Sequence, residues 1–330
     1  MSKLRLLFDN FTLLLFAVVA AASLAPAHGV GAVIFEWITA AAIALLFFLH
    51  GAKLSRQAII AGAMHWRLHL LVFSCTFVMF PLLGWGLKPL LQPLLGASLY
   101  IGVLYLCALP GTVQSAIAFT SIARGNIPAA VCSASASSII GIVLTPMLVE
   151  LLLDADAGGA ISMLDAIYGI SKQLLLPFIA GHLSRPWIGA WVDRNQSWLK
   201  NVDQGSILLV VYTAFSASVI GGLWHTVPVS ALLWLTLVCC ALLAFVLAAT
   251  TWLARFFKFS HEDEITIVFC GSKKSMATGV PMAQVLFTGA MAGPALLPLM
   301  IFHQIQLMVC AVLAQRYRLR GEALATQAAS

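Results

Sequence analysis

Apolar runs of about 20 residues, each long enough to cross a bilayer as a helix, recur along nearly the whole chain. Inside a membrane every backbone polar group needs an internal partner, which leaves helices and closed barrels as the structures that can span it. The runs are too long for the ten-residue alternation of a barrel strand. Only 9% of the residues are charged, whereas soluble domains carry about 25%. The sequence therefore predicts an all-α integral membrane protein, with no polar stretch long enough for a separate soluble domain.

Ten transmembrane helices fit the pattern of apolar runs and polar breaks. The expected spans are residues 8–25, 33–50, 68–87, 99–123, 128–153, 161–182, 206–223, 229–255, 265–287 and 294–314. Two further segments are expected to form helices lying at the membrane interface, and the second combines aromatic and charged residues in the way typical of such helices. These are residues 57–64 and residues 184–198.

The distribution of basic residues predicts the orientation of these spans. With the N-terminus inside, the cytoplasmic side holds 14 of the 18 basic residues, as the positive-inside rule requires. We therefore expect a multi-pass protein of the plasma (inner) membrane with both termini cytoplasmic. The first span also resembles a secretory signal peptide, because basic residues precede it and a small-residue segment follows. Its removal would break an otherwise consistent scheme, so we expect it to be retained.

Several functional classes find no support in the sequence. The net charge of +6 comes from basic residues in short loops between spans, which indicates membrane topology and not nucleic-acid binding. The seven cysteines lie within apolar runs and form no CxxC pair, so we expect neither disulfides nor a metal site. The motifs of zinc proteases, serine hydrolases and P-loop enzymes are absent. We expect no enzymatic activity and no cofactor.

The chain divides into two halves with five spans each, residues 1–153 and residues 154–330. An odd number of spans per half places the two halves in opposite orientations, as in an inverted repeat. The fourth and ninth spans are interrupted at corresponding places, by Pro110-Gly111 and by Gly271. Paired interrupted spans in the two halves are the best sequence indication of a secondary transporter's binding site.

The ninth span contains two adjacent lysines, Lys273 and Lys274, inside an apolar run. A lysine at the centre of a bilayer costs about 2.5–3.5 kcal/mol on insertion scales. Gly271 and Pro281 also weaken the helix that should shield this backbone from lipid. Such a segment is tolerated where protein or a water-filled cavity surrounds it, so we expect residues 265–282 to form the centre of a transport site.

Two stretches carry a resemblance to a known family. Residues 108–115 with the exit Arg124-Gly125-Asn126, together with Phe269-Cys-Gly-Ser-Lys-Lys-Ser-Met276, resemble the bile acid:sodium symporter superfamily and within it the SBF-like branch. The resemblance extends over nearly the whole chain. It implies a core domain in which spans four and nine cross, a panel domain made of spans one, two, six and seven, and a substrate site between the two domains.

The sodium sites that this resemblance implies are not retained. Sodium-coupled members carry a glutamate two residues before the glycine of the ninth span and a glutamine two residues after it. Here these positions hold Phe269 and Lys273. The Ser-Asn pair of the fourth span is not clearly kept either, and its counterpart is Gln114-Ser115 or Ala116-Ile117, depending on the alignment. No Asp or Glu lies near the middle of any expected span.

Three lysines within spans have alternative roles. Lys273 either replaces a sodium ion by binding freed backbone carbonyls or contacts an anionic substrate. Lys274 has the same alternatives, with substrate contact favoured. Lys172 either lines the cavity or extends to the interface. A Schiff-base lysine is disfavoured, because no carboxylate counter-ion accompanies any of the three.

Polar residues near the two breaks complete the candidate substrate- or ion-binding site. The serines of the fifth span more often allow close helix packing than ligand binding, and His303 more often makes a packing hydrogen bond than a proton transfer. The candidate residues are Pro110, Gly111, Thr112, Gln114, Ser115, Ser133, Ser137, Lys172, Gly271, Ser272, Lys273, Lys274 and Ser275.

The sequence thus predicts a secondary transporter of a small organic solute, with an organic anion favoured by the unpaired lysines. The usual sodium coupling is expected to be lost. The alternative is a regulatory membrane protein that modulates ion entry, for example of calcium, without moving an organic solute. The expected partners are the solute and the lipid bilayer, with no nucleic acid, and the sequence leaves the oligomeric state open.

Overall fold

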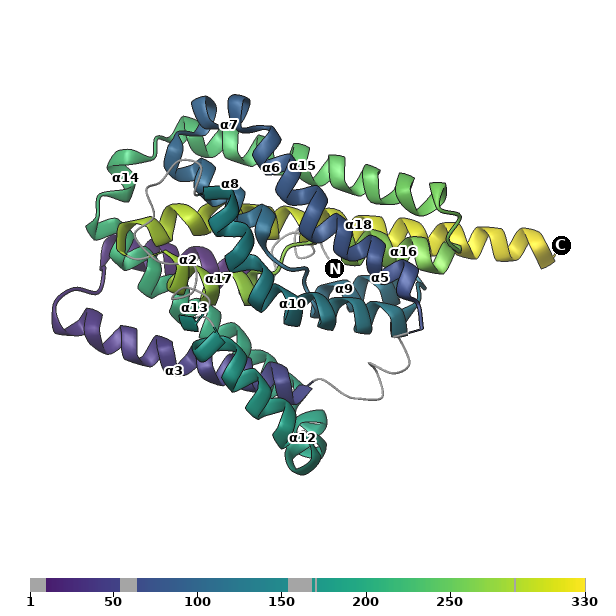
Figure 1. The fold of residues 1–330 in the computed structure, drawn as a ribbon, viewed down its shortest axis with the longest axis horizontal. Helices are drawn as coiled ribbons and strands as arrows, with labels where there is room; N and C mark the ends of the chain where they lie inside the picture. Colours follow the sequence, from purple (N-terminus) through teal and green to yellow (C-terminus); the bar gives the residue numbers. More distant parts are fainter. Residues whose placement is uncertain (1–9, 54–63, 154–167, 170, 288, 330) are drawn as a thin grey trace.

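The computed structural model describes residues 10–53, 64–153, 168–169, 171–287 and 289–329, and within these residues all regular structure is helical (Figure 1). Residues 57–63 of one expected interfacial helix lie outside the described part. Among the described residues, six helices are long and apolar enough to cross a membrane. The chain is therefore a multi-pass membrane protein, as the sequence predicts.

The first half contains the helices of residues 10–153. They are α2 (Asn10–Leu24), α3 (Val30–Lys53), α5 (Trp66–Ser74), the π-helix η1 (Cys75–Met79), α6 (Phe80–Gly86), α7 (Lys88–Leu95), α8 (Ala97–Ala108), α9 (Gln114–Ile122) and α10 (Ile127–Leu153). Helices α5, η1 and α6 follow each other without a gap and form one span. Helices α8 and α9 are the two parts of the interrupted fourth span.

The remaining helices lie within residues 171–329. They are η2 (Ser171–Leu175), α12 (Leu176–Arg194), α13 (Gln196–Ile220), α14 (Leu223–Thr226), α15 (Val229–Phe256), α16 (His261–Gly271), α17 (Met276–Leu286), η3 (Gly289–Met291) and α18 (Ala292–Ala329). Helices α16 and α17 are the parts of the interrupted ninth span.

Among the boundaries that differ from the sequence prediction, two lie within residues 184–206. The segment 184–198 is not a separate interfacial helix, because α12 continues through Pro186 to Arg194. Helix α13 begins at Gln196 and not near residue 206, which brings Asp203 into a helix. The first difference follows from packing, because α12 lies along α3 and this contact favours a continuous helix (Figure 1).

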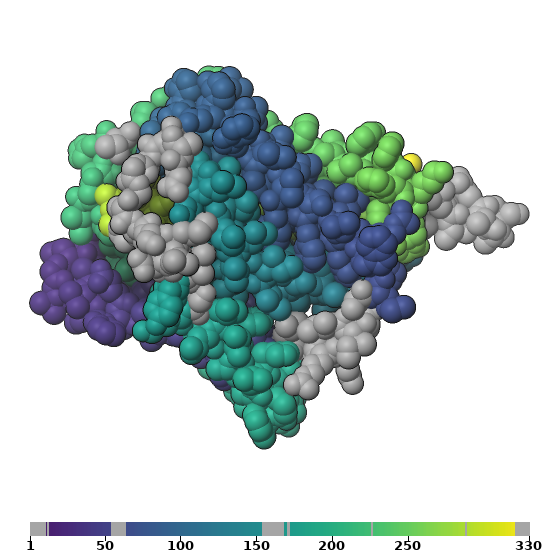
Figure 2. All heavy atoms as spheres, in the orientation of Figure 1, coloured from purple at the N-terminus to yellow at the C-terminus, as the bar shows by residue number. Residues whose placement is uncertain are grey.

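Backbone contact between α3 and α12 is exceptionally close. A Cβ atom on Gly51 would lie 2.0 Å from the carbonyl oxygen of Phe178, and one on Gly181 would lie 1.8 Å from that of Phe48. Small residues allow helices to approach in this way where no hydrophobic effect drives them together. Helix α13 packs on α2 and α3, and α12 projects from the body of the molecule (Figure 2). We call α2, α3, α12 and α13 the four-helix group.

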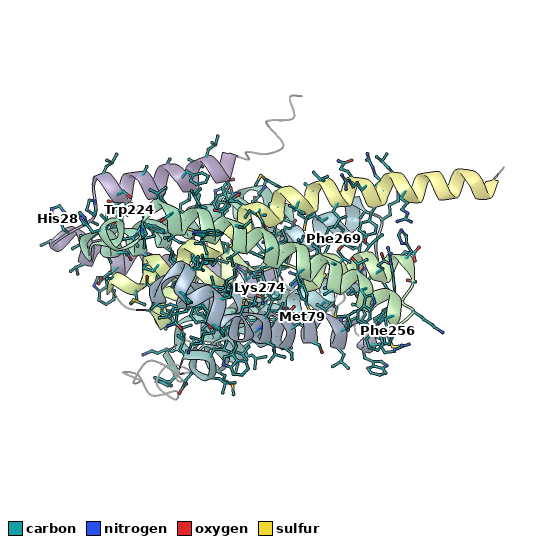
Figure 3. The ribbon with its side chains drawn as sticks, turned by 90° about the horizontal axis from the view of Figure 1, so that it is seen from above. His28, Met79, Trp224, Phe256, Phe269 and Lys274 are labelled. Atoms are coloured by element: carbon teal, nitrogen blue, oxygen red, sulfur yellow. The ribbon has the colours of Figure 1, made fainter. Side chains whose placement is uncertain are left out.

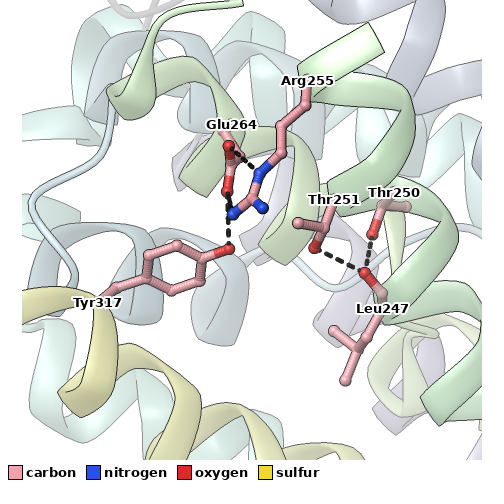
Figure 4. A network of polar contacts seen from close by, with 6 residues as sticks. All are labelled: Leu247, Thr250, Thr251, Arg255, Glu264 and Tyr317. Atoms are coloured by element: carbon pink, nitrogen blue, oxygen red, sulfur yellow. Dashed lines mark hydrogen bonds and ion pairs between the residues drawn. The ribbon is translucent and has the colours of Figure 1, made fainter. Parts of the chain in front are cut away.

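The remaining long helices are joined by apolar packing and by a polar network at one end (Figure 4). Arg255 at the end of α15 donates two hydrogen bonds of 2.9 Å to the carboxylate of Glu264 in the first turn of α16. The hydroxyl of Tyr317 in α18 donates to the same carboxylate at 3.2 Å. Three helices are thereby fixed to each other beside the start of the interrupted span.

Candidate functional site at the helix crossing

The two interrupted spans meet where their helices end. The backbone N–H of Ser275, just before α17, donates to the carbonyl of Pro110, just after α8, at 2.9 Å. A Cβ atom at Gly111 would lie 3.2 Å from the carbonyl oxygen of Cys270, so glycine permits the close approach of the two breaks. The N–H of Gly111 donates to Ser137 Oγ of α10 at 3.0 Å. Residues far apart in sequence thus form one crossing.

The end of α8 exposes carbonyl groups that no helical N–H can satisfy. Pro110 has no N–H and stops the helix. The structure supplies other donors: Thr145 Oγ1 donates to Ala108 O at 2.9 Å, and Leu109 N donates to Leu106 O at 3.3 Å. The carbonyls of Cys107 and Leu109 both accept hydrogen bonds from the ammonium group of Lys274.

A third unsatisfied carbonyl comes from the π-helix in the third span. In η1 the N–H of Phe80 bonds to Cys75 O, five residues back. In this register the next carbonyl, Thr76 O, would accept from residue 81, but Pro81 has no N–H. Lys274 Nζ donates to Thr76 O instead, at 2.9 Å. The proline that the sequence places in this span therefore creates an acceptor for the lysine.

Lys274 is fully buried, and the residue lies near the middle of the molecule's length (Figure 3). Its three donors match three carbonyls: Cys107 O at 2.8 Å, Leu109 O at 2.7 Å and Thr76 O at 2.9 Å. The Phe80 ring centroid lies 4.1 Å from Nζ. A cation at the C-terminal end of α8 also interacts favourably with the helix dipole. The arrangement resembles the shell of carbonyl oxygens around a bound metal cation.

The backbone of Lys274 is held by one side chain of α18. Gln306 Oε1 accepts from Lys274 N at 2.9 Å, and Gln306 Nε2 donates to Lys274 O at 2.9 Å. Gln306 Nε2 also lies 2.9 Å from His303 Nδ1. The side-chain amide of Gln306 thus supplies both backbone hydrogen bonds of Lys274, which lies between α16 and α17, where no helical hydrogen bonds are available.

Lys273 is also fully buried but points to a different place. Its Nζ donates to Ser115 O in α9 at 2.9 Å and lies 4.1 Å from the Phe119 ring centroid and 5.2 Å from that of Phe269. Phe269 occupies the position where the family resemblance places a sodium-binding glutamate. Lys274 therefore holds the segment between α16 and α17 against η1 and the end of α8. Lys273 holds the same segment against α9.

A hollow of about 300 Å³ lies between the crossing and the four-helix group. We call it the central hollow. The first residues of α9 and α17 line it from one side, and α2, α3 and α13 line it from the other. Neither lysine of the crossing is part of its lining. Its polar residues are His50, Thr112, Gln114, Ser115, Lys200, Asp203, Gln204, Ser275, Thr278 and His303.

Asp203 is the carboxylate among the lining residues that the sequence reasoning missed, which also include His50, Lys200, Gln204 and Thr278. Its Oδ2 forms an ion pair with Lys53 at the end of α3 and accepts from Gln114 Nε2 at 3.4 Å. The expectation that the site would lack carboxylates fails for this hollow. The cause is the helix boundary, since placing Asp203 in a loop before the seventh span hid it from a search of span interiors.

The other predicted site residues take varied positions. Ser133 Oγ lies 2.6 Å from His69 Nδ1, and Ser272 Oγ donates to Val268 O at 2.6 Å, one turn back along the chain. Lys172 is exposed on η2 and lines neither of the two hollows described here. By contrast, Thr112, Gln114, Ser115 and Ser275 line the central hollow.

A second polar hollow of about 270 Å³ lies farther along α3, α13 and α17. Its lining includes Glu36, Thr39, Gln173, Thr213 and Gln284. Thr39 and Thr213 share a hydrogen bond of 2.8 Å, and Gln284 Nε2 donates to Val210 O at 3.2 Å. Both hollows thus lie along α13, with the apolar segment around Val210 between them.

Comparison with known proteins gives a consistent result. The SBF-like CPA transporter family matches residues 9–319. An uncharacterized protein of Pseudomonas aeruginosa is 68% identical over 99% of this chain and 98% of its own. "Putative symporter YfeH" of Escherichia coli is 57% identical over 98% of this chain and 97% of its own. Rat "Sodium/bile acid cotransporter 7" is 28% identical over 89% of this chain and 88% of its own.

Proposed function

Because the chain belongs to the SBF-like CPA transporter family, a group of membrane transporters of the bile acid:sodium symporter type, we propose that it moves a small organic anion by alternating access and without sodium. The family relation establishes the general class of membrane transporter. The anion and the absence of sodium coupling are proposed from the residues at the helix crossing and in the central hollow.

The observation that carries the sodium-independent proposal is the position of the Lys274 ammonium. Three backbone carbonyls from two spans surround it at 2.7–2.9 Å. A sodium ion coordinated there would need the same oxygen atoms. Because the lysine is covalently attached, its amino group stays beside these carbonyls through the transport cycle, and the crossing needs no ion from solution to be stable.

The anionic character of the solute is supported by two helix N-termini. Gln114 begins α9 and Met276 begins α17, and both line the central hollow. Helix N-termini carry unpaired N–H groups and a partial positive charge, which together favour anions. Lys200, an exposed lysine of α13, adds a positive charge to the lining. Half-helices with this role occur in other secondary transporters.

Alternating access is supported by the location of the two hollows. The central hollow and the second hollow lie along the same helix, α13, between the four-helix group and the helices of the crossing. We propose that the four-helix group is the panel domain and that the two halves, residues 1–153 and residues 154–330, form an inverted repeat. Movement of the panel against the crossing would open one hollow and close the other.

The test is uptake by the purified protein in proteoliposomes. Labelled organic anions are offered with sodium or with an equal concentration of choline on the outside. The proposal expects uptake above that of protein-free vesicles and equal rates in the two media. Strict dependence on sodium would refute the sodium-independent mechanism, and uptake of organic cations in place of anions would refute the substrate class.

A further inference from the structure

A groove of about 740 Å³ lies between α15 and α18 and shares no lining residue with either hollow. Its walls come from residues spaced about one turn apart on each helix. They are Leu247, Ala248, Thr251, Trp252 and Arg255 of α15, and Met308, Val309, Val312, Leu313 and Arg316 of α18. Thr251 donates its hydroxyl to Leu247 O at 2.7 Å, within its own helix (Figure 4). Apart from the two arginines, the groove therefore presents apolar walls.

Both arginines lie at the same end of this groove. Helices α15 and α18 lie side by side (Figure 1), and Tyr317, next to Arg316 in sequence, shares the carboxylate of Glu264 with Arg255. Each arginine comes eight residues after the first lining residue of its helix, so each wall is about 12 Å long at 1.5 Å per residue. Each is also the first Asp, Glu, Lys or Arg of its helix. Both therefore lie where the hydrocarbon core meets the phospholipid headgroups.

The charges at this end favour an anion. Two guanidinium groups stand against one carboxylate, that of Glu264, which accepts from Nε and Nη2 of Arg255 at 2.9 Å. A guanidinium carries five N–H donors, so Arg255 can bind a phosphate as well as this carboxylate. Arginine suits phosphate because its planar fork can donate two parallel hydrogen bonds. Both arginines are exposed at the surface, and a phosphate can reach them from the bilayer.

The occupant of the groove must be apolar along its length and anionic at one end. A second copy of the chain fits these conditions poorly, because a symmetric contact through this face would bring the arginines of both copies together, and like charges at an interface are costly. An anionic phospholipid has an acyl chain for the apolar walls and a phosphate for the arginines. Basic pockets between membrane helices bind lipid headgroups in this way.

We infer that this groove is a binding site for an anionic phospholipid. The phosphate lies between Arg255 and Arg316, and an acyl chain extends along the apolar walls. Trp252, one turn before Arg255 and 61% exposed, lies at the depth where tryptophan is enriched in membrane proteins. The bound lipid holds α15 to α18 beside the contact of Arg255 with Glu264, and it thereby stabilises the start of the interrupted ninth span. The inference does not depend on which solute the protein transports.

Thermal unfolding of the full-length protein with defined lipids tests the inference. Delipidated protein in detergent receives phosphatidylglycerol or phosphatidylcholine with the same acyl chains and at the same concentration, and melting is followed by tryptophan fluorescence. The choline group of the second lipid places a cation beside the arginines, so its binding should be weaker. At saturation, phosphatidylglycerol should raise the melting temperature by about 5 °C or more above phosphatidylcholine, because a ligand that binds the folded state stabilises it.

Two variants connect this preference to the groove. Arg316→Gln removes one of the two phosphate-binding groups and should reduce the difference between the lipids by at least about half, since hydrogen bonds to charged groups are among the stronger ones. Arg318→Gln is the matched control: it removes the same charge from α18 two residues away, outside the lining, and should leave the difference unchanged. Ala248→Trp fills the groove and should also reduce the difference, because the acyl chain loses its place.

The outcomes separate a specific site from a general attraction to negative charge. Equal shifts with the two lipids, or an equal shift with inorganic phosphate alone, would overturn the inference. An effect of Arg318→Gln as large as that of Arg316→Gln would assign the preference to a diffuse basic surface and would also overturn it. If the lipid-free protein is a dimer that Ala248→Trp dissociates, a second copy covers the groove and the inference is wrong. The comparison of lipids on the wild-type protein decides the matter even where a variant does not fold.

Discussion

Replacing Lys274 with methionine tests the central claim about the crossing. Methionine has nearly the length of lysine and remains apolar, so the change removes the ammonium with little change in volume. It leaves the carbonyls of Thr76, Cys107 and Leu109 without the donor that each now has at 2.7–2.9 Å. We therefore expect a loss of stability and not merely a loss of substrate affinity.

The expected magnitude follows from two opposing contributions. Three buried acceptors without partners cost about 1–3 kcal/mol each, or about 3–9 kcal/mol together. Against this, the variant avoids desolvating an ammonium, which costs several kcal/mol. The balance of these two contributions is a net loss of about 3–5 kcal/mol. At about 2–4 °C per kcal/mol, the melting temperature should fall by roughly 6–20 °C.

The measurement is thermal unfolding of the purified protein in detergent, followed by tryptophan fluorescence. Lys172→Met is the matched control, because it removes the same group from an exposed side chain, and its melting temperature should stay within about 1 °C of the wild type. If Lys274→Met melts like this control, the ammonium does not stabilise the carbonyls, and the proposal that it takes the place of a bound cation is refuted.

Three further changes have defined outcomes in the same thermal assay. Gln306→Leu removes both partners of the Lys274 backbone and should cost about 2–4 kcal/mol, since two buried groups lose their hydrogen bonds; a neutral result would contradict this role. Glu264→Gln weakens the contact with Arg255, whose side chain is 57% exposed, so we expect a loss of about 1 kcal/mol or less, and a larger loss would contradict this solvent screening. Gly111→Ala crowds a facing carbonyl at 3.2 Å and should cost about 1–3 kcal/mol, whereas Gly205→Ala meets nothing within 4 Å and should be neutral or stabilising.

The predicted pair of breaks is found in the structure, because local chemistry determines it. Pro110 has no backbone N–H and therefore ends the helix that precedes it. The polar segment after Gly271 contains residues that favour the start of a helix. Ser275 caps α17 by accepting from Thr278 N at 3.2 Å. These signals act within a few residues of the chain, so they can be read without knowledge of the fold.

The roles of the two lysines could not be assigned in the same way. The sequence left both substrate contact and replacement of a cation open for each. Lys274 meets its three carbonyls only because α8, the π-helix and the start of α17 converge at one point. The π-helix itself depends on tertiary packing, and its effect on Thr76 could not be read from Pro81 alone. Lys273 instead contacts α9 and two aromatic rings.

The sequence by itself determined the membrane class, the positions of most helices and the two interruptions, because hydrophobic length, proline and glycine act locally. It also carried the family resemblance. The tertiary structure alone decided which oxygen atoms surround each ammonium and that Asp203 lies at the hollow beside Gln114. Contacts between residues 89 positions apart in the chain depend on how helices pack, and packing is set by the sum of many weak contacts that no single stretch of sequence contains.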